Sequence, residues 1–128
     1  SNANGTRSGQ VVVFALNVTD NKWYQHGNAI KGPGYWAWFG WTVSLSADGS
    51  VFAAGTWSGS RLACAASVYE FSPIAEEWSQ RGGCLGDEQF QSLVHVTLSS
   101  TGSIVLVAYP RANGMKQCWV KINFTQNN

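Results

Sequence analysis

Apolar and polar residues alternate from Trp41 to Ser46, and a second apolar run follows from Ser50 to Gly55. In the first run, tryptophan, valine and leucine occupy every other position, with threonine and serine between them, which is the period of a β-strand. Asp48-Gly49 separates the two runs, and glycine accepts the positive φ that tight hairpin turns require. The pattern predicts a β-hairpin over residues 41–55.

The hairpin belongs to a repeat. A weaker copy covers residues 94–108, with Thr101-Gly102 at its turn, and Gly49 and Gly102 are 53 residues apart. A second set of landmarks recurs at an offset of 55, because Trp23, Gln25 and Gly27 are matched by Trp78, Gln80 and Gly82. Two independent landmarks thus give almost the same period, which predicts repeated structural units.

The repeat predicts four strands per unit and no helix. The stretch from Ser72 to Trp78 has some helical character, but Pro73 and its match to Asn17–Trp23 favour a turn. The nine expected strands are Val11–Val18, Lys22–Ile30, Trp41–Ser46, Ser50–Gly55, Ala66–Phe71, Glu77–Leu85, Leu93–Leu98, Ser103–Tyr109 and Gln117–Phe124.

Units of four strands with periods of 40–50 residues are typical of β-propeller blades. The chain also resembles FG-GAP-type repeats, which form integrin-α-like β-propellers, over residues 11–124. The resemblance is carried by Phe39-Gly40, by Val-Ser-Leu-Ser-Ala-Asp-Gly at 43–49, by Gly55-Thr-Trp57, and by the strands at 68–71 and 78–80. The copies drift, because Phe39-Gly40 becomes Phe90-Gln91.

The expected architecture is therefore all-β, made of four-stranded antiparallel blades of a β-propeller, about two and a quarter blades per chain. Ser1-Asn2-Ala3 looks like the remnant of a cleaved expression tag, and residues 4–128 form one domain. Within it we expect a partial blade at 11–30, a full blade at 39–86 and a partial blade at 90–124.

Propellers have four to eight blades, so this number leaves apolar flanks open. The expected partners are further copies of the chain, in a homo-oligomer that completes the propeller, or further blades of a longer parent chain. The half blade at the start and the unfinished blade at the end suggest strand complementation between chains.

Composition indicates the cellular location of the protein and argues against nucleic acid and a membrane span. Charged residues make up 12% of the chain, about half of the ~25% usual for soluble domains, and there are 14 glycines and seven tryptophans. This favours an extracellular or cell-surface module. A net charge of +1 gives no electrostatic case for nucleic acid, and no run of about 18 apolar residues could span a membrane.

Three cysteines, at positions 64, 84 and 118, lack the spacing of a zinc site or a redox pair. One disulfide is an open alternative, with Cys64 and Cys84 as the expected pair because both lie in one repeat. The other alternative is that all three are small buried apolar residues.

The residue pattern predicts neither an enzyme nor a metal or cofactor site. The family's calcium loop is reduced to Asp48, a single carboxylate where calcium needs six to eight oxygens, so Asp48 is expected to bond backbone amides of its turn. His95 is expected at a polar core site and His26 at the surface. The acid pairs Asp87-Glu88 and Glu76-Glu77 leave a secreted hydrolase as the alternative.

A binding face is expected where loops of adjacent units gather. Aromatic side chains and arginines are enriched at binding surfaces, and the ligand would be a protein or a glycan. The candidate residues are Tyr35, Trp36, Trp38, Trp57, Arg61 and Arg111. The alternative is that Trp38 and Trp41 are wedged between blades, as Trp23, Trp78 and Trp119 are expected to pack within them. The predicted function is thus non-catalytic binding or assembly, and a purely structural piece of a longer propeller is a further alternative.

Overall fold

The chain is built from antiparallel β-sheets. The computed structural model describes residues 8–32, 38–56, 65–85, 94–110 and 116–122, and no helix occurs among them. The all-β prediction is confirmed over this part of the chain.

The strands follow the predicted order closely. They are β1 (Gln10–Val11), β2 (Phe14–Asn17), β3 (Lys22–Gln25), β4 (Ile30–Lys31), β5 (Thr42–Leu45), β6 (Val51–Gly55), β7 (Ala66–Ser72), β8 (Glu77–Leu85), β9 (His95–Leu98), β10 (Ile104–Pro110) and β11 (Lys116–Ile122). The two strands predicted first are each interrupted, so Val11–Val18 becomes β1 and β2, and Lys22–Ile30 becomes β3 and β4.

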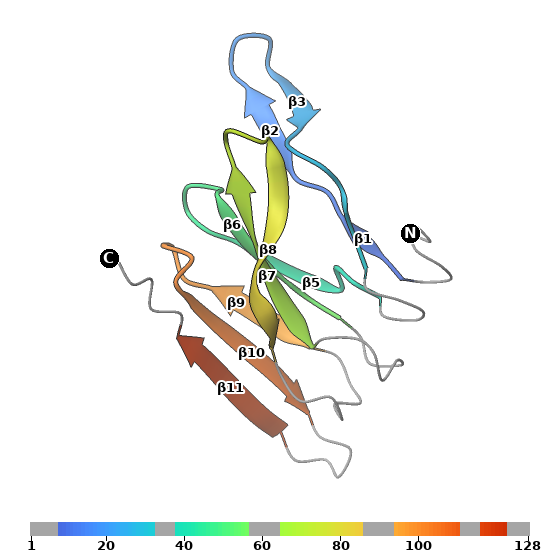
Figure 1. Cartoon of the computed structure of the whole chain (residues 1–128), viewed down its shortest axis with the longest axis vertical. Coiled ribbons are helices and arrows are strands. Elements are labelled where there is room, and N and C mark those ends of the chain that lie inside the picture. The colour runs from blue at the N-terminus through green and yellow to red at the C-terminus, as the bar shows by residue number, and fades with distance from the viewer. Residues whose placement is uncertain (1–7, 33–37, 57–64, 86–93, 111–115, 123–128) are drawn as a thin grey trace.

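The sheets form a series along the chain. A four-stranded sheet has the order β5-β6-β7-β8, a three-stranded sheet has the order β11-β10-β9, and β2 and β3 form a hairpin whose continuation is the short pair β1-β4. In Figure 1 the β2–β3 hairpin lies at one end of the molecule and the β9–β11 sheet at the other, with β5–β8 between them.

Both faces of β6, the second strand of the four-stranded sheet, are covered, which explains why all of its residues are buried. On one face, Val51 and Ala53 of β6 pack with Val96, Leu98 and Val107 of the three-stranded sheet. On the other face lies a second cluster, formed by Ile30, Phe39, Phe52, Ala54 and Trp78, with Val11 and Val13 packed against it. The alternation of strand residues thus divides β6 between two apolar cores.

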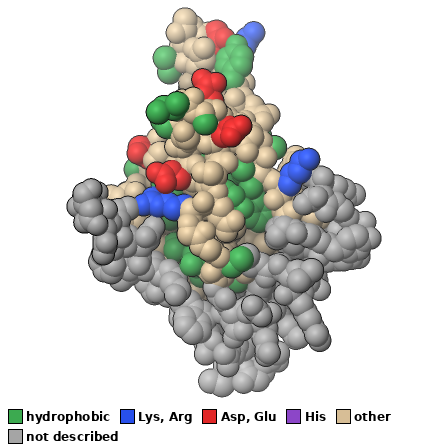
Figure 2. Space-filling model, viewed as in Figure 1, with side chains coloured by type: hydrophobic (Ala, Val, Ile, Leu, Met, Phe, Trp, Pro, Cys, Tyr) green, Lys and Arg blue, Asp and Glu red, His purple; other side chains and the backbone are tan. Residues whose placement is uncertain are grey.

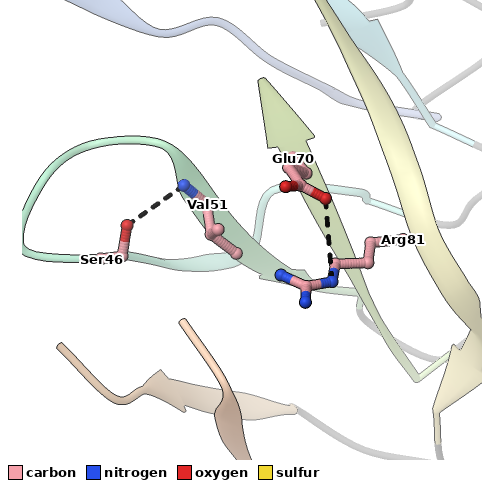
Figure 3. A network of polar contacts seen from close by, with 4 residues as sticks. All are labelled: Ser46, Val51, Glu70 and Arg81. Atoms are coloured by element: carbon pink, nitrogen blue, oxygen red, sulfur yellow. Dashed lines mark hydrogen bonds and ion pairs between the residues drawn. The ribbon is translucent and has the colours of Figure 1, made fainter. Parts of the chain in front are cut away.

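The turn at Asp48-Gly49 has the predicted hairpin geometry. Gly49 has a φ of 76°, and Gly102 in the second hairpin has the same value. The Oδ1 atom of Asp48 accepts hydrogen bonds from the N–H of Ser50 at 3.0 Å and from the hydroxyl of Ser46 at 2.9 Å. The Ser46 hydroxyl oxygen in turn accepts the N–H of Val51 at 3.1 Å, as Figure 3 shows. The prediction that Asp48 bonds turn amides is confirmed.

Candidate functional site

Of the six residues proposed for a binding face, the described part of the chain includes Trp38. Tyr35, Trp36, Trp57, Arg61 and Arg111 lie outside the described residues, so that face remains a prediction.

Trp38 and Trp41 form an aromatic pair at the entrance to β5. Their ring centroids are 5.5 Å apart at an interplanar angle of 48°, and the N–H of Trp41 donates to the carbonyl of Trp38 at 3.1 Å. Trp38 has a φ of 49°, a left-handed conformation that is strained for a residue with a bulky side chain. Trp38 is half-buried, whereas Trp41 is exposed on the same face of β5 as Val43 and Leu45.

Cys84 is disulfide-bonded. Its expected partner, Cys64, lies outside the described residues, so the pairing itself stays a prediction.

One of the two acid pairs of the hydrolase alternative falls within the described residues. Asp87 and Glu88 lie outside them, and Glu76 and Glu77 are exposed at the β7–β8 turn. Among the residues that the structure describes, no three histidines, cysteines or acids are grouped as metal ligands would be.

Both histidine predictions were wrong. His95 is exposed, because Val96 and Leu98 take the inward positions of β9 and leave the alternate positions to solvent. His26 is half-buried, because its ring stacks on Phe71 with a centroid distance of 4.0 Å.

His26 belongs to a socket that holds Trp78, formed by the backbone of His26 and Gly27 and by the side chain of Asn28. The indole Nε1–H of Trp78 donates to the carbonyl of His26 at 2.8 Å, and its backbone N–H donates to Oδ1 of Asn28 at 2.7 Å. A Cβ added at Gly27 would lie 2.6 Å from Cδ1 of Trp78, so this position requires glycine. The socket explains why β3 and β4 are separate strands: the segment between them leaves the sheet to hold the indole.

The repeat predicts a second socket at Arg81, Gly82 and Gly83, 55 residues further along the chain, where these residues lie within β8 and Gly83 takes the place of Asn28. Gly82 has a φ of 72°, close to the 82° of Gly27. A Cβ added at Gly82 or Gly83 would meet no atom of the described residues within 4 Å, so these residues leave the second socket open.

Trp23, the residue equivalent to Trp78, is correspondingly uncovered. Trp78 is 4% exposed, whereas Trp23 is 66% exposed. Leu16 and Phe14 share the same face of the β2–β3 hairpin by register and are also exposed. The expectation that Trp23 packs within the fold was therefore wrong for this chain on its own.

The inner strands show the same contrast. Val96 and Leu98 of β9 are buried against β6, but their equivalents in β5, Val43 and Leu45, are 54% and 52% exposed. Gly102 packs on Val51, since an added Cβ would lie 2.9 Å from the valine Cβ, whereas a Cβ added at the equivalent Gly49 would meet no atom of the described residues within 4 Å.

The flank at the other end of the molecule, formed by β10, is also open. Ile104 and Leu106 of β10 are the equivalents of the buried Val51 and Ala53, yet both are exposed. Figure 2 shows hydrophobic side chains at the surface, including some over the end of the molecule where Figure 1 places β2 and β3. Each flank thus exposes the residues that the repeats bury between themselves inside the chain.

Charged groups play a small part at these surfaces. The Nε atom of Arg81 lies 3.8 Å from Oε2 of Glu70 across β7 and β8, a long and partly exposed ion pair (Figure 3). Exposed pairs of this kind contribute about 0–1 kcal/mol. The flanks are therefore suited to apolar contact rather than to electrostatic steering.

No family model, curated protein or solved structure matches the chain. Within the described ranges, no helix is long and apolar enough to cross a membrane.

Proposed function

We propose that the chain is a non-catalytic binding and assembly module built from β-propeller-type blades. The observation that carries the proposal is the contrast between covered and open faces of the same repeat. Strand β6 is covered on both sides by neighbouring repeats, whereas β2–β3, β5 and β10 each have an open face. The module's working surfaces are these open flanks.

The assignment of the sheets as propeller blades is supported by their strand order and by the directions in which their side chains point. The β5–β8 sheet is a four-stranded antiparallel meander, and each repeat turns one set of alternate side chains toward the preceding repeat and the other set toward the next. Successive sheets related in this way are the arrangement of propeller blades. The resemblance to FG-GAP-type repeats points to the same architecture.

An extracellular or cell-surface location is part of the proposal. The disulfide at Cys84 supports it, because disulfides persist in oxidising compartments and are rare in the cytosol. The low content of charged residues is consistent with a chain whose flanks are covered in its working form.

Sedimentation equilibrium of the wild-type chain, from nanomolar to high micromolar concentration, tests the assembly function. Association is expected, with little dependence on salt because the open faces are apolar. A chain that remains monomeric over the whole range, while its circular dichroism shows folded β-structure, would contradict the assembly function.

A ligand site for a glycan or a protein loop is the second candidate, favoured by the Trp38–Trp41 pair. Aromatic rings with one exposed edge are common at such surfaces. A glycan array with the wild type, Trp41→Ala and the control Tyr24→Ala tests it. Binding that is lost only in Trp41→Ala supports a glycan site, and an array with no signal for the wild type removes the glycan form of this candidate.

A further inference from the structure

We infer that two copies of the chain associate head to tail, with Trp23 of one copy inserted into the open Arg81–Gly83 socket of the next. This inference rests on the proposed assembly function and adds the partner, the register and the residues. Its template is the contact that the chain already makes between its own repeats, where Trp78 occupies the His26–Asn28 socket.

Trp23 and the glycine of the second socket are both exposed on one chain, and the Asn28 acceptor of the first socket is replaced by Gly83 in the second. Trp23 is exposed on β3, and the second socket has the same left-handed glycine as the first, with open space above it. By the repeat, the carbonyl of Arg81 would accept the Trp23 indole N–H as the carbonyl of His26 accepts that of Trp78. The Arg81 guanidinium replaces the His26 ring, whose centroid is 6.1 Å from that of Trp78. A guanidinium at that place would make a cation–π contact with Trp23.

The same register joins the inner strands. Inside the chain, Val96 and Leu98 of β9 pack on Val51 and Ala53 of β6. Val43 and Leu45 are the equivalents of Val96 and Leu98, and Ile104 and Leu106 are the equivalents of Val51 and Ala53. In the assembly, the exposed Val43 and Leu45 of the second copy therefore pack on the exposed Ile104 and Leu106 of the first. Gly49 then packs on Ile104 as Gly102 packs on Val51. A single placement of the second copy therefore covers both open flanks.

This placement has a consequence for β11. Inside the chain, β7 pairs with β6 and β8 pairs with β7. By the repeat, β2 of the second copy would pair with β10 and be followed by β3. In the single chain, β11 already pairs with that edge of β10. Association therefore exchanges β11 for the incoming β2 and completes a four-stranded sheet in the order of β5–β8. The completed sheet then has the four strands of a propeller blade.

Two complementary variants test the inference by native mass spectrometry. Trp23→Ala removes the inserted side chain and leaves the socket intact. In the first socket, the Trp78 ring lies where a Cβ of residue 27 would be, so a side chain at Gly82 should block the same place in the second socket. Gly82→Asn is chosen because asparagine tolerates the left-handed backbone better than other non-glycine residues. Each variant alone is expected to associate at least about tenfold more weakly than the wild type, the effect typical of an aromatic residue at an interface centre.

An equimolar mixture of the two variants is expected to form a 1:1 dimer that does not grow further, because one intact Trp23 and one intact socket remain. Tyr24→Ala, on the opposite face of the same hairpin, is the control and should associate as the wild type does. Urea unfolding of each variant shows whether it is folded, and Gly83→Phe replaces Gly82→Asn if the latter is not, since Gly83 has open space above it.

The outcomes separate this inference from the proposed function. Wild-type association without a 1:1 dimer in the mixture overturns the head-to-tail register and leaves the assembly function standing. A wild type that never associates overturns both. Hydrogen exchange gives a second readout: the amides of β11 should exchange faster in the assembled protein than in the dilute chain, and unchanged protection of β11 overturns the strand exchange.

Discussion

The tryptophans at positions 23 and 78 allow the same substitution to be made at equivalent points of two repeats with different expected results. Trp78 is 4% exposed, contacts Phe52 and Phe71 at ring distances of 4.9 and 5.2 Å, and donates its indole N–H to His26. Replacing a buried tryptophan by alanine costs about 3–5 kcal/mol, because transfer energy is lost and a cavity remains. We expect Trp78→Ala to lower the free energy of unfolding by about 4 kcal/mol.

Trp23→Ala should cost much less in the dilute chain. With 66% of Trp23 exposed, folding removes roughly a third of a surface of about 250 Å² from water, or ~80 Å². At about 25 cal/mol per Å² this gives ~2 kcal/mol as an upper bound, and residual burial in the unfolded chain reduces it to about 1.5 kcal/mol. The two equivalent substitutions should therefore differ by about 2.5 kcal/mol.

Urea unfolding followed by far-ultraviolet circular dichroism, at a concentration where the chain is monomeric, measures both values. The slope of the free energy against urea concentration should be the same in the wild type and both variants, so that midpoint shifts report stability. Trp78→Phe is a matched control that keeps an aromatic ring and loses the indole hydrogen bond, and it should lie between wild type and Trp78→Ala. Equal costs for Trp23→Ala and Trp78→Ala would refute the assignment of one socket as occupied and the other as open.

Two further predictions concern the glycines of the sockets and the hairpin turn. Gly27→Ala and Gly82→Ala each place a side chain at positive φ, which costs about 1–2 kcal/mol of folding free energy. Gly27→Ala also drives a Cβ into the Trp78 ring, so urea unfolding should show it to cost about 1–3 kcal/mol more than Gly82→Ala. Equal costs would contradict the occupied socket. The N–H of Ser50, followed by the hydroxyls of Ser50 and Ser46, holds the pKa of Asp48 below its ordinary value. Because the folded-state pKa is depressed, this carboxylate stabilises the fold above its unfolded pKa of about 3.9, and the contribution is lost as pH falls through the lower folded value. Asp48→Asn should therefore differ from the wild type in stability at neutral pH and converge with it in acid, and a difference that is constant with pH would contradict this role.

The hairpins and the strand order could be predicted from sequence, because both depend on local signals. Alternation over 41–46, a glycine at each turn and two landmarks at offsets of 53 and 55 were enough to place β5–β8 and β9–β11 within one or two residues. The breaks between β1 and β2 and between β3 and β4 were not predictable in this way. They arise because residues 26–28 hold Trp78 through hydrogen bonds between residues that are 50 and 52 positions apart in the sequence.

Exposure was the other quantity that the pattern could not supply. The repeat predicts the same place within a unit for Trp23 and Trp78, but burial depends on whether another unit covers that place. His95 illustrates a similar error, because its match to the half-buried Thr42 suggested a core site, whereas Val96 and Leu98 hold the inward positions of β9. Of the proposed aromatic face, Trp38 alone falls within the described residues, and its position beside Trp41 follows from the left-handed turn at Trp38 rather than from spacing.

Fluorine NMR of the chain labelled with 5-fluorotryptophan tests the central claim most directly, because it reports the solvent exposure of each of the seven tryptophans separately. Single substitutions assign the resonances of Trp23 and Trp78, and the shift on changing from H2O to D2O measures their exposure. In the dilute chain, Trp23 should show a large solvent shift and Trp78 almost none, and on association the Trp23 resonance should lose its solvent shift. A Trp23 resonance that is protected in the dilute monomer, or that stays fully exposed in the assembled protein, would contradict the account.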